Sequence, residues 1–389
     1  MSYYVGIDIA KFKHDCFIVT GDGEVVRASF SFPNNEDGFK ELKAALDQLD
    51  HSQKIKVGLE ATGHYGRNLK LFLTSIGYEY SELNPYLVKK YSESITLRRT
   101  KTDKKDAMLI AKYLQFEASK SNQELSYTIY DLKTLTRSRD KLVRTRSNEL
   151  VIITNCLDRM FPEYKSFFGG KLGKCALTIL EKYQTPDKIA KMNDSTIVKM
   201  HNISRSISVN KLIRLKDLAK VTVGHSSKSD VFVMGQSIKR FNMIDEDITE
   251  IEEEIKVMMK EIKSPIETIP GIGTISAASI IAEFGDIKRF STSSKMLAYA
   301  GLECSKHQSG QEDFKGRMVK HGSEHLRYVL MNVAVTVKNF SPTFASYYIK
   351  KRDEGKCYRV ALNHVVKKLL RLIFKLTSTD TQYNLSLSK

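Results

Sequence analysis

The stretch YYVGIDIAK at residues 3–11 places an acid, Asp8, inside an otherwise apolar run. A second run, IKVGLE at residues 55–60, ends in another acid, Glu60. Both runs are short and rich in β-branched or aromatic residues, which predicts buried strands. A carboxylate inside a buried strand is costly unless it is paired or bound to a metal. These two strands therefore indicate both the fold and the position of a site.

The elements around these runs follow a recognisable order. Three predicted strands form a meander around the turn Gly21-Asp22-Gly23, and helix, strand, helix and strand follow. This is the order of the α/β ribonuclease-H-like (RuvC-like) fold, which we predict for residues 1–125. The predicted strands lie at 3–8, 14–20, 24–32, 55–60 and 78–83, and the predicted helices lie at 34–49 and between residues 63 and 75.

Beyond this domain the sequence predicts helices. A helical coiled-coil middle region covers residues 126–264, a mainly α C-terminal domain covers 265–376, and a tail covers 377–389. The middle region ends in a heptad seam of apolar residues, which indicates either a coiled coil between chains or an amphipathic helix packed within one chain. The seam residues are Phe241, Ile244, Ile248, Ile251, Ile255, Met258 and Ile262.

Composition narrows the classes of function. Lys and Arg number 62 against 45 Asp and Glu, a formal net charge of +17, which favours a polyanionic partner. No apolar run is long enough to span a membrane, and the N-terminus lacks the form of a signal peptide, so we expect a cytoplasmic protein. The cysteines are scattered singly, which disfavours a zinc site; they are Cys16, Cys156, Cys175, Cys304 and Cys357.

A further pair of acids, Asp103 and Asp106, lies in KTDKKDA at residues 101–107. Three residues apart on a helix, the two share one face. Together with Asp8 and Glu60 they form a set of four hard oxygen ligands suited to Mg²⁺ or Mn²⁺, as phosphodiester chemistry requires. Each acid alone is explained as well by a cap or an ion pair. The neighbouring lysines would hold phosphates; they are Lys101, Lys104 and Lys105.

The C-terminal domain begins with IPGIG at residues 269–273, which is typical of a helix–hairpin–helix. Gly271 and Gly273 would let backbone amides approach a phosphate, although a plain helical turn explains the pattern too. Farther on, Ser305, Ser309 and Ser323 are possible nucleophiles, and the residues alone do not choose among them.

These motifs together resemble the DEDD transposases of the insertion-sequence one-ten family. The resemblance covers about residues 3–160 and 266–345, in order and at matching spacing, although His321 and Gln311 replace residues that are common in the family. It implies that Asp8, Glu60, Asp103 and Asp106 bind the metal and that Ser309 is the nucleophile. It also implies a structured guide RNA and donor and target DNA as partners.

The basic residues that we expect to bind nucleic acid lie in both halves of the chain, and recombination between two duplexes suits a homodimer or a dimer of dimers. Besides the three lysines and two glycines above, the basic candidates are Arg98, Arg99, Arg137, Arg144, Lys320 and Arg327.

Three other classes of protein compete with a transposase. A Holliday-junction-resolving nuclease would use the acidic site and would not need Ser309. A DNA-architectural protein would have no reason to bury Asp8 and Glu60. An actin-like phosphotransferase would need a second glycine-rich phosphate loop, which the sequence lacks.

Overall fold

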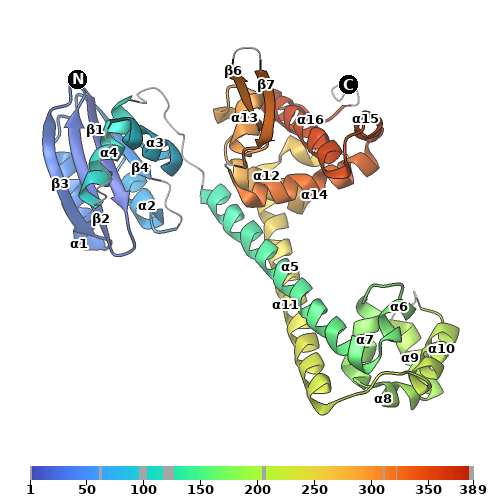
Figure 1. Ribbon diagram of the computed structural model, residues 1–389. Helices are drawn as coiled ribbons and strands as arrows, with labels where there is room; N and C mark the ends of the chain where they lie inside the picture. The colour runs from blue at the N-terminus through green and yellow to red at the C-terminus, as the bar shows by residue number, and fades with distance from the viewer. Residues whose placement is uncertain are drawn as a thin grey trace. The chain divides into compact units, whose positions relative to one another are not determined.

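The computed structural model describes residues 2–60, 64–95, 103–116, 127–203, 207–309, 312–320 and 322–384. The chain divides into two units, Met1–Ser126 and Tyr127–Lys389 (Figure 1). The regions that the sequence separates at residues 264 and 265 lie together in the second unit. In the part of the chain that is described, no helix is long and apolar enough to cross a membrane.

One mixed sheet organises the first unit, with its strands in the order β3-β2-β1-β4-β5. β1 pairs antiparallel with β2, which pairs antiparallel with β3, whereas β1, β4 and β5 run parallel. This sheet agrees with the predicted order of elements along the chain, a three-stranded meander followed by helix, strand, helix and strand. The strands are β1 (Ser2–Ile9), β2 (Lys13–Thr20), β3 (Val25–Pro33), β4 (Lys54–Glu60) and β5 (Tyr80–Leu83).

Helices cover both faces of this sheet. α1 (Glu36–Asp47) and α2 (Arg67–Ser75) bury their apolar sides against one face, with Ile7 and Leu59 at the centre of that core. α3 (Pro85–Ile95) and α4 (Asp103–Phe116) cover the other face. α4 crosses β1, β2, β3 and β4. The first unit is therefore a three-layer α/β structure, as the α/β prediction required.

Two long helices form the spine of the second unit. α5 (Tyr127–Met160) and α11 (Lys228–Ile262) lie side by side and antiparallel (Figure 1). Ile248 and Ile255 of the heptad seam are buried in this pair, so the seam packs within the chain, the second of the two interpretations above. Charged pairs also join the helices: Arg139–Glu252, Arg146–Asp245, Arg240–Glu149 and Arg159–Asp230.

Five short helices pack around one end of this pair, within the region predicted to be helical. Their shared core includes Tyr164, whose hydroxyl donates a hydrogen bond of 2.7 Å to the carbonyl oxygen of Ala176. The helices are α6 (Glu163–Phe167), α7 (Lys174–Tyr183), α8 (Pro186–Ala190), α9 (Asp194–Ile203) and α10 (Val209–Lys220).

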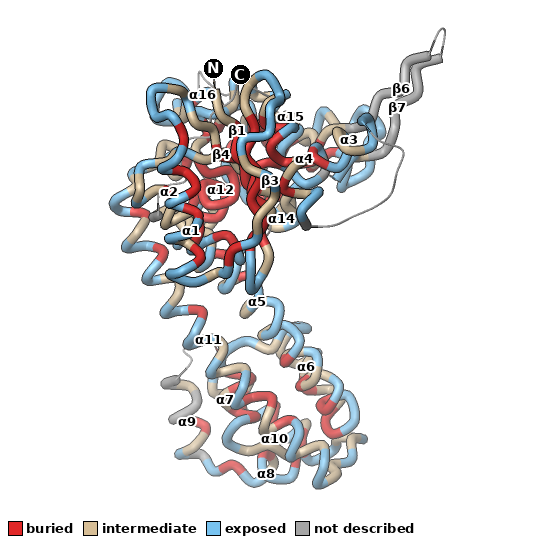
Figure 2. Tube along the Cα trace, turned by 90° about the vertical axis from the view of Figure 1, so that its left-hand side faces the viewer, coloured by how far each residue is buried: buried red, intermediate tan, exposed pale blue. Residues whose placement is uncertain are grey.

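The C-terminal part packs around α12 (Thr274–Phe284), which is buried along almost its whole length (Figure 2). A two-stranded hairpin of β6 (Cys304–Ser309) and β7 (Glu312–Met318) adds strands to this mainly helical part. The last helix continues to Thr379, past the predicted end of the domain at residue 376. The other elements are η1 (Pro265–Thr268), η2 (Ile287–Arg289), α13 (Ser293–Tyr299), α14 (Glu324–Phe340), α15 (Pro342–Asp353) and α16 (Tyr358–Thr379).

Candidate functional site

Asp8 and Glu60 lie at equivalent positions of two neighbouring parallel strands. Ile7 of β1 is in register with Leu59 of β4, and the two acids are the next residues along these strands. Both side chains are half-buried. Because successive residues of a strand alternate between faces, Asp8 shares a face with Gly6, and Glu60 shares one with Gly58.

The two glycines identify this face as the one under α4. A Cβ atom on Gly6 would lie 2.3 Å from the carbonyl oxygen of Ala107 and 2.3 Å from the nitrogen of Ala111. A Cβ atom on Gly58 would lie 3.1 Å from Leu114. The helix therefore rests directly on β1, at a distance that only glycine permits, and the two acids follow on the same face.

The other two predicted ligands lie in the first turn of α4. Asp103 is the first residue of the helix, and its side chain is outside those that the structure describes. Asp106 is half-buried and precedes Ala107, which contacts Gly6. Ser29 of β3 donates a hydrogen bond of 2.8 Å to the carbonyl oxygen of Lys104, which fixes this turn of α4 to the sheet.

The donor chemistry of this set suits a hard divalent cation, because all four side chains are carboxylates. Among the described side chains, no three His, Cys, Asp or Glu groups are arranged to hold one ion. That set includes Asp8, Glu60 and Asp106, so these three are not brought together as ligands of one ion. The four-ligand arrangement, which also needs the side chain of Asp103, remains a prediction. The register of β1 with β4 and the packing of α4 on Gly6 are the observations that agree with it.

A fifth carboxylate, Asp15, belongs to the same face and was not predicted. It lies opposite Asp8 on β2, with only 2% of its surface exposed. The hydroxyl of Ser31 donates a 2.5 Å hydrogen bond to it, and the ammonium nitrogen of Lys13 lies 3.7 Å away. The alternating pattern of β2 could have predicted it. Asp15 lies two and four positions before Phe17 and Val19, so the three side chains share the buried face of the strand.

The predicted nucleophile, Ser309, lies at the far end of a hairpin. It is the last residue of β6 and pairs with Glu312 of β7. Its side chain, together with Gly310 and Gln311, is outside what the structure describes. At the base, the Val319 amide donates to the carbonyl of Glu303 (2.9 Å) and the Lys320 amide to that of Gly301 (3.1 Å). These bonds hold the base of the hairpin, and Ser309 lies at the opposite end of its strand.

A buried acid anchors the chain just after this hairpin. Glu283 of α12 is 3% exposed and receives two hydrogen bonds from the Arg137 guanidinium on α5, at 2.7 and 3.1 Å. Ser323, the N-cap of α14, donates a third of 2.6 Å. Burial acts to raise the pKa of Glu283, but the hydrogen bonds from Arg137 and Ser323 and the charge of Lys133 outweigh it, so this pKa lies below its usual range.

The structure assigns local partners to several of the predicted nucleic-acid-binding residues. Arg137 pairs with Glu283, Arg144 lies over the Tyr328 ring at 5.5 Å, and Arg327 donates to the carbonyl of Gly322 at 2.8 Å. Exposed side chains at the predicted positions are those of Lys104, Lys105, Arg137, Arg144 and Lys320. Arg98, Arg99, Lys101 and His321 lie outside the described residues.

The two glycines of the predicted helix–hairpin–helix differ in their surroundings. Gly271 has a φ of +93°, and a Cβ atom there would lie 2.8 Å from the backbone of Val337. Thr336 also donates a 2.7 Å hydrogen bond to the Gly271 carbonyl. Gly271 is thus required for packing on α14. Gly273 caps α12 with nothing within 4 Å of its Cβ position, so its side of the backbone is open.

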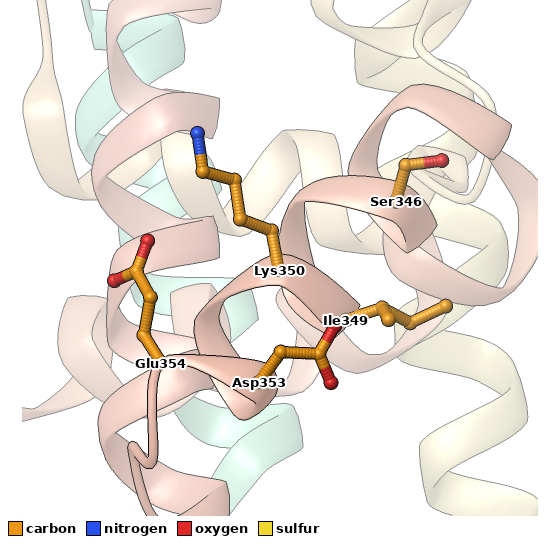
Figure 3. Close-up of a pocket in the computed structure, with 5 residues that line it drawn as sticks. All are labelled: Ser346, Ile349, Lys350, Asp353 and Glu354. Atoms are coloured by element: carbon orange, nitrogen blue, oxygen red, sulfur yellow. The ribbon is translucent and has the colours of Figure 1, made fainter.

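A surface pocket lies on α15 and Glu354, away from every predicted position. Its lining is Ser346, Ile349, Lys350, Asp353 and Glu354. Figure 3 shows these side chains diverging from one helix, with Lys350 and Glu354 on one side and Ile349 on the other. They do not converge on a common point, so we assign the pocket no chemistry.

Two stretches of the chain match families of transposases. Residues 5–162 match a transposase family of DEDD type named for IS110, and residues 263–349 match the transposase IS116/IS110/IS902 family. The pilin gene-inverting protein of Moraxella bovis is 26% identical over 381 residues, covering 95% of this chain and 94% of the relative. A protein of the insertion element IS110 from Streptomyces coelicolor is 23% identical over 390 residues, covering 98% and 95%. The transposase for the insertion sequence element IS1111A of Coxiella burnetii is 24% identical over 335 residues, covering 85% and 76%.

Proposed function

The chain belongs to the IS110 (insertion-sequence one-ten) family of transposases, enzymes that cut and rejoin DNA, and we propose that it does so with two sets of groups, one in each unit. The DEDD type of its first domain indicates a requirement for a divalent metal. The identity of that ion, the serine chemistry, the guide RNA and the number of subunits are parts of the proposal.

In the first unit, Asp8, Glu60, Asp103 and Asp106 would hold Mg²⁺ or Mn²⁺. The observation that carries this part is the in-register placement of Asp8 and Glu60 beside a helix that rests on Gly6. A cation bound there neutralises charge on the scissile phosphate. The exposed Lys104 and Lys105 on the same helix would contact the flanking phosphates.

In the second unit, Ser309 would be the nucleophile. Its Oγ would attack phosphorus, forming an O–P bond while the bond to the leaving DNA oxygen breaks and that oxygen gains a proton. Attack by a DNA hydroxyl would then reverse this chemistry on a new strand. A serine hydroxyl needs activation, and the phosphate held at the acidic site would supply an activated partner. Because the bond energy is kept in the phosphoserine, rejoining needs no ATP.

Basic surfaces agree with two kinds of polyanion, DNA and a structured guide RNA, because both are gripped through phosphates. Recombination joins two duplexes, so we propose a dimer or a dimer of dimers. The seam itself is used within the chain, which leaves exposed apolar residues such as Met243 and Val257 of α11 for contacts between chains. If these contacts form, the double substitution Met243→Lys and Val257→Lys should lower the molecular mass of the protein measured by light scattering.

The test of the proposal is a covalent adduct. Protein with its RNA is incubated with labelled target DNA and Mg²⁺ and then denatured in SDS. Wild type should retain labelled DNA, and Ser309→Ala should retain none, while Ser305→Ala serves as the matched control on the same strand. Cleaved DNA without an adduct in wild type would instead favour a nuclease that uses the acidic site alone.

A further inference from the structure

The turn between β1 and β2 presents an aromatic side chain to solvent. Ile9 of β1 pairs with His14 of β2, and the short segment between them includes Phe12. Phe12 is 76% exposed, far more than a phenylalanine that packs in a core. A single exposed apolar residue is common in proteins, so the surroundings of Phe12 decide whether it has a use.

The backbone of this turn is held in place. The amide of Asn34, which follows β3, donates a 2.9 Å hydrogen bond to the carbonyl oxygen of Phe12. The side-chain nitrogen of Asn34 donates a second, of 3.3 Å, to the carbonyl oxygen of Lys11. Binding through the ring therefore requires little additional ordering of the backbone, which lowers its entropic cost.

The turn also lies beside the proposed acidic site. It connects the strand ends that carry Asp8 and Asp15, which are paired in register. At the usual strand rise of about 3.3 Å per residue, the ring lies roughly 10 Å beyond Asp8 along the hairpin. Bases follow one another at about 3.4 Å in stacked DNA and farther apart in an extended strand, so this distance is at most a few nucleotides from a phosphate held at Asp8.

Lysines flank Phe12 on both sides in the sequence. The Lys11 ammonium nitrogen lies 5.0 Å from the centre of the Phe12 ring. The Lys13 side chain is 53% exposed, with its ammonium nitrogen 3.7 Å from Asp15. An aromatic ring between cations is the arrangement that binds single-stranded nucleic acid, in which the ring stacks on a base and the cations contact phosphates.

We propose that Phe12 stacks on an unpaired DNA base close to the strand that is cut at the acidic site, with Lys11 and Lys13 contacting the neighbouring phosphates. This inference rests on the proposed function only for the position of the cut. In an intact duplex both faces of each base are covered by its neighbours, so the ligand is unpaired DNA. Strand exchange creates such bases, because a strand must leave one partner before it pairs with another.

The chain contains no tryptophan, so Phe12→Trp introduces a single fluorescent indole at the site. The probe is a duplex with a central bubble of unpaired thymines, compared with the fully paired duplex of the same length. Stacking tolerates any base, so the natural target sequence is unnecessary. Indole emission should be quenched by the bubble and much less by the duplex. Phe232→Trp is the matched control, since Phe232 is 68% exposed on α11 in the second unit.

Phe12→Ala should weaken binding to the bubble by about 10-fold or more, the usual loss of one base stack, and leave binding to the duplex unchanged. Phe12→Trp should bind the bubble as wild type does, which separates stacking from a general loss of fold. Equal quenching in Phe12→Trp and Phe232→Trp, or wild-type bubble binding by Phe12→Ala, would overturn the proposal. Neither measurement needs cleavage, so failure of the metal-site proposal would show separately, as full strand-exchange activity in Asp8→Ala.

Discussion

The acidic site and the serine hairpin have different kinds of structural support. Asp8 and Glu60 lie on paired strands of a five-stranded sheet, with a helix packed against the adjoining glycines. Ser309 lies at the end of a two-stranded hairpin, and the described backbone hydrogen bonds from this hairpin to the rest of the fold lie at its base. A two-stranded hairpin alone is only marginally stable, so its position depends on what it contacts.

This difference suggests a division of labour. A rigid sheet suits ligands that must stay within a fraction of an ångström of a metal, because small displacements of a catalytic group are costly. A hairpin suits a nucleophile that must reach a phosphate, attach to DNA and release it again. We therefore expect substitutions of the acids on the sheet to lower activity directly. Substitutions at the base of the hairpin should lower the free energy of unfolding.

The largest effect should come from the acids themselves. Removing Asp8, Glu60, Asp103 or Asp106 by alanine should lower the rate of strand exchange by about 10⁴-fold, as the loss of a catalytic group does in other enzymes. The variants should still fold, because Asp8, Glu60 and Asp106 are only half-buried and Asp103 is the first residue of its helix. The measurement is recombination of labelled DNA with Mg²⁺, with Asp22→Ala in the exposed β2–β3 turn as control. Wild-type rates in any one variant would remove that acid from the site.

The next effect tests how α4 is held on the sheet. Gly6→Ala should destabilise the first unit by about 3 kcal/mol or more, because its Cβ atom would overlap the backbone of α4. Gly23→Ala is the control: its φ of +89° strains alanine, but nothing lies within 4 Å, so the cost should be about 1 kcal/mol. Both values come from denaturant unfolding followed by circular dichroism. Equal losses would mean that α4 does not rest on Gly6.

The contrast between the two regions also explains what the sequence could predict. Short apolar runs predicted β1 and β4, and Asp8 and Glu60 were noticed because an acid in an apolar run is conspicuous. Asp15 was overlooked because it follows two polar residues, Lys13 and His14, at the start of β2. No such pattern distinguishes Ser309 from Ser305 or Ser323, since a Ser-Gly pair mostly indicates a turn. Ser309 was predicted as the nucleophile only because of the resemblance to a family.

Partners distant in sequence were beyond prediction. The heptad pattern of α11 predicts that its apolar face packs against another helix. It does not predict whether that helix belongs to the same chain or to a second one, because both would bury the same residues. Arg137 was predicted to bind nucleic acid because it lies in a basic stretch. Its carboxylate partner Glu283 is 146 residues away, and no local pattern connects the two.

A smaller effect tests the anchor of the serine hairpin. Glu283 is 3% exposed and its partner Arg137 is 45% exposed. Arg137→Ala leaves a buried carboxylate without its counter-charge and should cost about 3 kcal/mol. Glu283→Gln leaves an arginine that water can reach and an amide that still accepts from Ser323, so it should cost about 1 kcal/mol. Thermal unfolding of the two variants measures the difference, and the reverse order would mean that the pair is not held as described.

The smallest effect concerns acid stability of the sheet itself. His14 on β2 is fully buried, packed edge-on against Phe32 at 5.3 Å between ring centres. Burial lowers the pKa of His14, while the neighbouring side chain of Asn34 and the charge of Asp15 partly oppose this shift. The histidine is therefore neutral when the sheet is folded and gains a proton more readily when it unfolds.

The sign of the pH dependence follows from this. Below the unfolded pKa of about 6.5 the unfolded state binds more protons than the folded state. The free energy of unfolding therefore decreases as the pH is lowered, by at most about 1.4 kcal/mol per pH unit, until the pKa of the folded state is reached. Above 6.5 this residue contributes no pH dependence. His14→Leu should remove that slope from the unfolding of the first unit, whereas leucine at the exposed His51 should retain it. Urea unfolding between pH 5 and 8, at the unchanged ionic strength that surface charges require, measures both. Parallel stability profiles for wild type and His14→Leu would show that His14 accepts its proton without opening the sheet, and the rigidity that we ascribe to the strands around Asp8 would then be overstated.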